Sequence, residues 1–364
     1  MKKIPSLFFV GGFLGAGKTT AIRTMAKLLA KRGLKAVAIT NDQAAGLVDT
    51  LFLENEGIPS QEVAGSCFCC NFQGLADAIK HSSEAHNPDV ILAEPVGSCT
   101  DIVATIVRPM RSFMKDFVNV SAYSVLIEPK RWIQCAKDGG QAAWSIKFLF
   151  HKQVQEADIL VVNKSDTISS DQSEKLRSEI QLRYPEIKVL CMSAKDPASV
   201  ENWLDLAQVS APGDRWLKEI DYSQYAEAEA DMGWLNANVS TKFINPVDGK
   251  MVTADVAANI QKEIEERKGE IGHIKLLAIG NTGSIKVGAT VNREPMDIEG
   301  AFLGPVSDVK LTLNIRASIS PGDLAEIVIK AINVLRKSFQ ATAEVSFLNT
   351  FRPGTPNPTY RFTT

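Results

Sequence analysis

A glycine-rich segment near the start of the chain carries the strongest chemical signal. Residues 12–19 read Gly-Phe-Leu-Gly-Ala-Gly-Lys-Thr, and they lie between the apolar run 7–10 and a helical pattern over residues 20–30. In such a strand–turn–helix segment, backbone N–H groups of the turn and of the helix N-terminus surround phosphate oxygens. Lys18 can supply a positive charge to the β- and γ-phosphates, and the Thr19 hydroxyl can ligate Mg²⁺. The segment therefore predicts a nucleoside triphosphate site.

A second motif indicates the base. Residues 163–166 read Asn-Lys-Ser-Asp and follow the apolar run 159–162. The Asp166 carboxylate can accept hydrogen bonds from the N1–H and 2-amino groups of guanine, a pair that adenine cannot form. Asn163 can reach the base edge and the loop, while the Lys164 stem can lie over the ring. These residues favour GTP over ATP.

Carboxylates at strand ends can hold the magnesium ion. Glu94 ends an apolar strand and is followed by Pro95-Val96-Gly97, so it can bind Mg²⁺ or its water, the alternative being a capping role at the strand end. Gly97 would let the backbone approach the γ-phosphate and move when it leaves. Asp42, after the strand expected at 35–41, is the second candidate.

These motifs all fall where one edge of a parallel sheet is expected, the usual place for a ligand. The predicted catalytic residues are Lys18, Thr19, Asp42 and Glu94, the last three also being the predicted Mg²⁺ ligands. The predicted GTP/GDP contacts, including a second base loop at 193–195, are Gly12, Gly15, Ala16, Gly17, Lys18, Thr19, Thr20, Gly97, Asn163, Lys164, Asp166, Ser193 and Ala194.

A cysteine cluster, Cys67-Phe68-Cys69-Cys70, is the third feature. Three thiols so close together suit, as thiolates, a soft or borderline cation such as Zn²⁺, Co²⁺ or Cu⁺. The segment alone cannot close a four-ligand site, so other ligands or a second subunit would be needed. The alternatives are simple burial and a thiol redox site. The scattered Cys99, Cys135 and Cys191 are interpreted as buried small apolar residues of a protein in a reduced compartment.

Around these motifs, short apolar strands alternate with helical patterns up to residue 208. The strands are expected at 6–11, 35–41, 90–94, 122–127, 159–163 and 187–192, as in a doubly wound, mostly parallel α/β sheet. Residues 209–231 are interpreted as a linker. Residues 232–364 predict a smaller α+β domain of the ferredoxin-like kind. Its strands are expected at 236–243, 271–279, 284–291, 309–317 and 343–347, and its helices at 253–268, with Asp255 near the start, and at 321–337, capped by Ser320.

Composition narrows the classes of function. The 364 residues suggest two domains, with three as the alternative. A net charge of −2 from 40 basic and 42 acidic side chains gives no basic field for nucleic acid. Apolar stretches are far shorter than the roughly 18 residues that span a membrane. The short apolar run after Lys3 flows into the phosphate loop, so we do not interpret it as a cleaved leader and expect a cytoplasmic protein.

The N-terminal two-thirds of the chain resembles the CobW family of GTPases, relatives of the nickel-enzyme accessory proteins HypB and UreG. The match lies in the phosphate loop, Asn41-Asp42 with Asp49, the C-x-C-C signature at 67–70, the segment 94–97 and the motif at 163–166. The resemblance implies a GTPase that carries or inserts a metal, or acts on cobalamin-type cofactors, and often dimerises with nucleotide bound. The chain departs from the family at Ser66, at 42–45, where Ala45 replaces a common Glu, and at 95–96.

The expected function is therefore slow GTP hydrolysis by a metal chaperone or metal-cofactor insertion factor. Its expected partners are a guanine nucleotide, a transition metal such as Zn²⁺ or Co²⁺, a client apo-metalloenzyme or cofactor-dependent enzyme, and a second copy of the chain, without nucleic acid or membrane. The alternative is a GTP-gated docking protein that carries no metal, which the changes at 42–45 favour. An ATP-using kinase or synthetase is disfavoured by residues 163–166.

Overall fold

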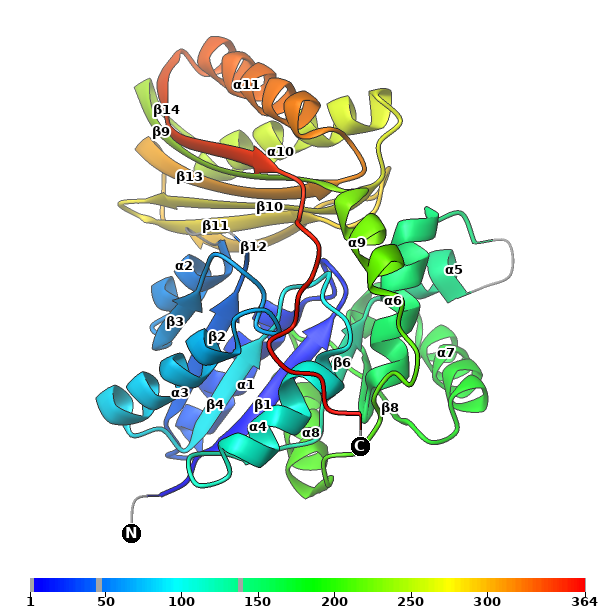
Figure 1. Cartoon of the computed structure of the whole chain (residues 1–364). Coiled ribbons are helices and arrows are strands. Elements are labelled where there is room, and N and C mark those ends of the chain that lie inside the picture. Colours follow the sequence, from blue (N-terminus) through cyan, green and yellow to red (C-terminus); the bar gives the residue numbers. More distant parts are fainter. Residues whose placement is uncertain (1–2, 44–47, 137–139, 364) are drawn as a thin grey trace. The chain divides into compact units, whose positions relative to one another are not determined.

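The computed structural model describes residues 3–43, 48–136 and 140–363 (Figure 1). The chain forms two compact units. Unit 1 comprises Met1–Ala45, Leu53–Tyr225 and Thr355–Thr364, and unit 2 comprises Gly46–Phe52 and Ala226–Gly354. Unit 1 holds the phosphate loop, Asn41-Asp42, the cysteine segment, the segment 94–97 and the motif at 163–166, whereas Asp49 belongs to unit 2. Ala44 and Ala45 lie outside the described residues.

Unit 1 is built on a parallel sheet with the strand order β3-β2-β4-β1-β6-β7-β8, and β5 lies beside β1. Every recorded strand pair in it is parallel, which confirms the predicted sheet. β3 was missed because its sequence, Ser-Gln-Glu-Val, has no apolar run. The strands are β1 (Ser6–Gly12), β2 (Ala36–Asn41), β3 (Ser60–Val63), β4 (Val90–Glu94), β5 (Asn119–Val120), β6 (Ser124–Ile127), β7 (Ile159–Val162) and β8 (Lys188–Cys191).

Helices cover the sheet because its central strands are apolar on both faces. All β1 residues after Ser6 are buried. Phe8 and Val10 of β1 share a core with α1 and α8, including the buried Trp203. The helices of this unit are α1 (Lys18–Lys31), α3 (Phe72–His86), η1 (Val103–Val107), α4 (Arg108–Phe113), α5 (Pro129–Ala136), α6 (Trp144–Glu156), η2 (Ser165–Thr167), α7 (Ser170–Arg183) and α8 (Pro197–Val209).

Unit 2 is an antiparallel sheet with the order β12-β11-β10-β13-β9-β14 and two long helices. The order β10-β13-β9-β14, with α10 after β9 and α11 after β13, is the predicted ferredoxin-like arrangement, extended at one edge by β11 and β12. Its elements are β9 (Gly233–Val247), α10 (Gly249–Glu266), β10 (Ile271–Gly280), β11 (Gly283–Ala289), β12 (Asp297–Phe302), β13 (Val306–Ala317), α11 (Pro321–Ser338) and β14 (Ala341–Phe351).

Local signals explain most boundaries in unit 2. Gly280 pairs with Gly283 across the predicted hairpin, and the Ser320 hydroxyl accepts from the Asp323 N–H to cap α11. The expected start of α10 was wrong. The helix begins at Gly249, before the expected residue 253, because the Asp248 side chain accepts from the N–H groups of Lys250 and Met251.

Two elements are shared between the units or join them. Helix α2 (Val48–Asn55) contributes its residues up to Phe52 to unit 2 and the rest to unit 1. Residues 209–231, expected to be a linker, contain α9 (Tyr222–Ala230). The domain limits 1–208 and 232–364 remain a prediction.

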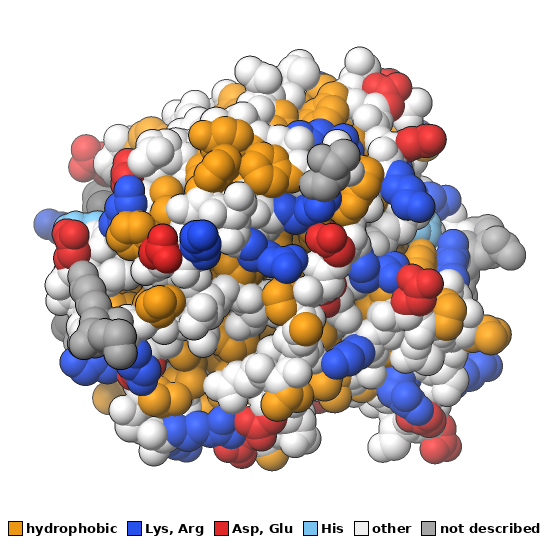
Figure 2. Space-filling model, turned by 60° about the horizontal axis from the view of Figure 1, so that its bottom comes forward, with side chains coloured by type: hydrophobic (Ala, Val, Ile, Leu, Met, Phe, Trp, Pro, Cys, Tyr) orange, Lys and Arg blue, Asp and Glu red, His pale blue; other side chains and the backbone are white. Residues whose placement is uncertain are grey.

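Surface and helix composition add two observations. Figure 2 shows one face of the molecule, on which basic and acidic side chains are interspersed with apolar ones. Within the described ranges, no helix is both long and apolar enough to span a membrane.

Candidate functional site: a phosphate loop beside a cysteine cluster

The phosphate loop connects β1 to α1 at the C-terminal edge of the sheet. It needs glycine because Gly12, Gly15 and Gly17 have φ angles of 128°, 77° and 85°. A Cβ at Gly17 would also lie 2.4 Å from the Asn163 amide nitrogen. Helix α1 begins at Lys18, so the N–H groups of its first turn have no acceptor within the helix. The loop thus has the shape and the donors of an anion-binding turn.

Lys18 and Thr19 converge on Glu94. The Lys18 ammonium donates to the Gly12 carbonyl at 2.9 Å and lies 3.8 Å from Glu94 Oε1. The Thr19 hydroxyl donates to the same carboxylate oxygen at 3.2 Å. All three side chains are buried. A hydroxyl and a carboxylate oxygen side by side are ligands of the type that Mg²⁺ prefers, so the donor set fits this ion.

Gly97 lies against the same loop. A Cβ at Gly97 would come within 2.8 Å of Leu14 Cδ2 and 3.0 Å of Lys18 Nζ. The segment after β4 therefore lies close to both the backbone and the lysine of the phosphate loop. That Gly97 responds to the γ-phosphate remains a prediction.

Asn163 joins the phosphate loop to the second base loop. Its side-chain amide donates to the Ala16 carbonyl at 2.8 Å, and its oxygen accepts from the Ala194 N–H at 2.8 Å. Asn163 is completely buried. The sequence predicted that Asn163 reaches both the base edge and the loop, and the base contact remains a prediction. The structure shows the loop contact.

The other residues predicted to contact the nucleotide differ in their surroundings. Lys164 adopts a left-handed φ of 60° and pairs with Glu128 at 3.3 Å. Asp166 is exposed in η2, so its carboxylate is accessible to a ligand. The Ser193 hydroxyl accepts from the Lys195 N–H at 3.3 Å, which shapes the second loop. Thr20 is buried in the first turn of α1.

The end of β2 supports the cysteines. Asn41 donates to the carbonyls of Val63 at 2.8 Å and Ser66 at 2.9 Å, and it accepts from the Phe68 N–H at 2.7 Å. Asn41 was named from the sequence only together with Asp42, and its place at a strand end was the available signal for these contacts. Its neighbour Asp42 is half-buried and accepts from the Gln43 N–H at 2.6 Å. Asp42 as a magnesium ligand remains a prediction.

The three clustered thiols lie together. Cys67 Sγ is 2.9 Å from Cys69 Sγ and 3.2 Å from Cys70 Sγ, and the last two are 3.8 Å apart. The turn is closed by the Cys70 N–H, which donates to the Cys67 carbonyl at 3.0 Å, and Asn71 then caps α3.

A fourth thiol joins the cluster. Ligand atoms of Cys67, Cys69 and Cys99 all lie within 4.8 Å of one another, and all three residues are buried. The interpretation of Cys99 as a buried residue was right. Its grouping with the scattered cysteines was wrong, because the turn after β4 brings it to the cluster. Cys99 lies 29 residues after Cys70, so local sequence spacing could not predict this contact.

The thiols differ in acidity. Hydrogen bonds with Cys69, Cys70 and Cys99 hold the pKa of the Cys67 thiol well below its usual range. The bond with Cys67 is also the main reason that the pKa of Cys69 is well above its usual range and that of Cys70 is raised to about 11. These pKa directions favour the thiolate at Cys67 and the thiol at Cys69 and Cys70.

The C-terminal segment of unit 1 contacts the cluster. The Asn357 N–H donates to Cys70 Sγ at 3.2 Å, and the Thr359 N–H donates to the Cys69 carbonyl at 2.9 Å. The Arg361 guanidinium pairs with the buried Asp101 carboxylate at 2.7 Å. Backbone groups far away in sequence therefore complete the surroundings of the cysteines.

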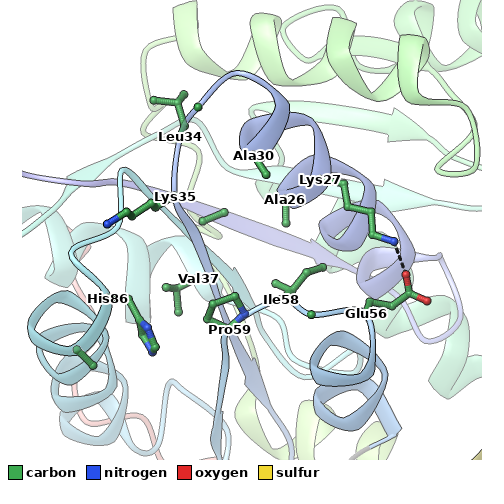
Figure 3. Close-up of a pocket in the computed structure, with 14 residues that line it drawn as sticks. Ala26, Lys27, Ala30, Leu34, Lys35, Val37, Glu56, Ile58, Pro59 and His86 are labelled. Atoms are coloured by element: carbon green, nitrogen blue, oxygen red, sulfur yellow. Dashed lines mark hydrogen bonds and ion pairs between the residues drawn. The ribbon is translucent and has the colours of Figure 1, made fainter.

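A pocket of about 760 Å³ lies elsewhere in unit 1. It is lined by the C-terminal half of α1, the start of β2 and the end of α3, including His86 (Figure 3). Lys27 and Glu56 pair at its side. These elements end or begin at the sheet edge opposite the phosphate loop, so this pocket is separate from the predicted site.

The fold and the phosphate loop define a P-loop nucleotide-binding protein. The sequence model of the CobW/HypB/UreG nucleotide-binding domain matches residues 6–190, and the chain belongs to this family.

Two curated relatives are similar in sequence. The zinc-regulated GTPase metalloprotein activator 1 of Dictyostelium discoideum is 24% identical over 256 residues, which cover 60% of this chain and 52% of that protein. The zinc chaperone YeiR of Escherichia coli strain K12 is 25% identical over 173 residues, which cover 46% of this chain and 49% of that protein. The chain thus spans about half the length of the curated relatives it matches.

Solved structures include two similar chains. Nickel-bound HypB from Helicobacter pylori gives a TM-score of 0.40 at 17% identity, covering 60% of this chain and 92% of that one. Zn(II)-bound YjiA GTPase from E. coli gives a TM-score of 0.37 at 15% sequence identity, and the match covers 92% of this chain and 100% of that one.

Proposed function

We propose that this protein binds and hydrolyses GTP and uses the cycle to control a transition metal ion, zinc in the first instance, held by Cys67, Cys69 and Cys70. One observation carries the proposal. The phosphate-loop residues Lys18 and Thr19 meet Glu94 at one end of β4, and three thiols within 3.8 Å of one another lie after the adjacent β2 and β3. The two curated relatives, both named for zinc, support this assignment.

The nucleotide chemistry follows from the buried charges. Lys18 and the loop N–H groups would stabilise the negative charge that develops on the γ-phosphate. Mg²⁺, held by Thr19 and Glu94 with Asp42, would supply further charge neutralisation. Asp166 would select guanine, and Asn163 would hold the base loop against the phosphate loop. The sequence motifs assign no arginine to the transition-state charge, so we expect slow turnover without a partner.

The metal chemistry follows from the sulfur cluster. Thiolates bind zinc more strongly than they bind hard cations, and the reduced state of all six cysteines suits a cytoplasmic protein. We further propose a client apo-metalloenzyme as the recipient of the metal and a nucleotide-dependent homodimer as the acting form.

The test combines two measurements on the purified, reduced protein. GTP hydrolysis is followed as phosphate release, and zinc binding by competition with a chromophoric chelator. We expect Lys18→Ala to abolish hydrolysis while leaving zinc binding intact. A Cys67/Cys69/Cys70→Ser triple variant should lose zinc and keep GDP binding. Zinc binding that survives in the triple variant would contradict the metal role and favour a docking GTPase.

A further inference from the structure

We propose that Cys99 is the fourth ligand of a tetrathiolate cation site formed with Cys67, Cys69 and Cys70 inside a single chain. The inference rests on the proposed metal-binding function. It goes further by naming a ligand outside the C-x-C-C segment, by making a second subunit unnecessary for binding, and by defining the cation as one that accepts four sulfur ligands in tetrahedral geometry.

The sulfur positions fit such a site. A tetrahedron with metal–sulfur bonds of about 2.3 Å has sulfur–sulfur edges of about 3.8 Å. The edges among Cys67, Cys69 and Cys70 are 2.9, 3.2 and 3.8 Å, and Cys99 lies within 4.8 Å of Cys67 and of Cys69. Cys67 and Cys69 are thus common neighbours of Cys70 and Cys99, and rotation of these side chains about χ1 is the adjustment that binding of the cation would require.

The backbone that carries Cys99 is fixed by buried side chains of α6. Gln153 donates to the carbonyls of Gly97 at 3.0 Å and Cys99 at 2.9 Å. The Glu156 carboxylate accepts from the Thr100 hydroxyl at 2.9 Å and from the Asp101 N–H at 2.7 Å. Gln153 and Glu156 are 2% and 0% exposed. A ligand held this way is pre-organised for binding.

The surroundings of Asp101 show how firmly the turn is held. Asp101 has a φ of 61°, in the left-handed region that non-glycine residues seldom adopt. Its carboxylate receives the Tyr222 hydroxyl and the Arg361 guanidinium, each at 2.7 Å. Asp101 lies two residues after Cys99, so a turn held at Asp101 restrains the backbone that carries the thiol.

The fourth ligand gives the metal a direct connection to the nucleotide. Cys99 lies two residues after Gly97, whose Cα faces Lys18 and Leu14 of the phosphate loop. The segment from Glu94 to Cys99 thus carries a predicted magnesium ligand, a contact with the phosphate loop and a metal thiol. Movement of Gly97 on γ-phosphate binding or loss would displace Cys99 and change the cation affinity.

The experiment uses the full chain loaded with Zn²⁺ or with Co²⁺ as a spectroscopic probe. Zinc X-ray absorption on the wild-type protein, confirmed as monomeric by light scattering, should show four sulfur ligands at about 2.3 Å. Cys99→Ser should bind zinc at least about 100-fold more weakly, since loss of an outer-shell partner alone costs 10- to 100-fold. Its cobalt complex should show weaker thiolate-to-cobalt charge-transfer absorption.

Cys191→Ser is the matched control, because Cys191 is half-buried at the end of β8 and donates to the Ser173 carbonyl. It should retain the zinc affinity and cobalt spectrum of the wild type. Three sulfurs and one lighter ligand in the monomer, or an unchanged affinity in Cys99→Ser, would overturn the inference while the metal role of the other cysteines stands. Loss of the metal role itself would appear instead as zinc binding indifferent to the Cys67/Cys69/Cys70→Ser variant. The absorption measurement needs no variant, so misfolding of Cys99→Ser leaves the test intact.

Discussion

Replacing Asn163 with alanine tests whether one buried amide holds the two nucleotide loops together. The side chain bridges the Ala16 carbonyl and the Ala194 N–H, at 2.8 Å each, and it is 0% exposed. Asn163→Ala removes both hydrogen bonds and leaves two buried backbone groups without this partner.

The expected cost follows from these two bonds. Leaving a buried donor or acceptor unsatisfied costs about 1–3 kcal/mol for each group. Because both groups lie at loops that can admit some water, we expect the free energy of unfolding of unit 1 to fall by about 3 kcal/mol. The phosphate loop would also lose its support, so GDP should bind about 10-fold more weakly, a change of about 1.4 kcal/mol.

The assay is urea unfolding followed by tryptophan fluorescence, with Trp203→Phe as a background that identifies the signal of Trp203. This side chain is buried in unit 1 and donates to the Ser124 hydroxyl at 3.0 Å. A fluorescent GDP analogue reports the affinity. Asn119→Ala serves as the control, because Asn119 is exposed in the two-residue strand β5. If the free energies of unfolding of Asn163→Ala and of the control differ by less than about 0.5 kcal/mol, the two hydrogen bonds of Asn163 do not stabilise unit 1 as proposed.

Three further outcomes are expected. Asp166→Asn should weaken GTP at least 100-fold with little effect on ATP, measured by competition binding, because the exposed carboxylate is the predicted guanine acceptor. Burial, followed by the charge of Asp101, raises the pKa of Glu156 to about 8 from 4.5. Between these two pH values the folded protein keeps a proton on Glu156 that the unfolded chain releases. The free energy of unfolding should therefore fall as pH rises from about 5 to 8, by up to about 1.4 kcal/mol per pH unit. Glu156→Gln should flatten this dependence on pH. Arg361→Ala should destabilise unit 1 by about 2 kcal/mol in denaturant unfolding, because the buried Asp101 carboxylate loses a charged donor.

The parallel sheet could be predicted because its strands carry their own signal. Strands such as β4 and β7 are apolar on both faces, and each ends in a polar motif at the same sheet edge. β3 and β12 could not be predicted, since a polar edge strand looks like a loop until its neighbour is known. Helix α10 began earlier than expected because a single capping residue, Asp248, outweighs the apolar period that follows it.

The site shows the same division between local and distant signals. The phosphate loop, Glu94 and the motif at 163–166 could be predicted because each has a fixed spacing and a strand before it. The position of Cys99 depends on how the turn after β4 is held by Gln153 and Glu156 of α6. Contacts of this kind join segments that are distant in sequence, and a single chain gives no pattern for them.

The central claim is that nucleotide and metal share the segment from Glu94 to Cys99. The most direct test measures zinc affinity with a non-hydrolysable GTP analogue and with GDP bound, and then the affinity for each nucleotide with and without zinc. The account predicts that zinc affinity differs between the two nucleotide states, and that zinc changes the ratio of nucleotide affinities by the same factor, as linkage requires. Equal zinc affinities in the two states would contradict it.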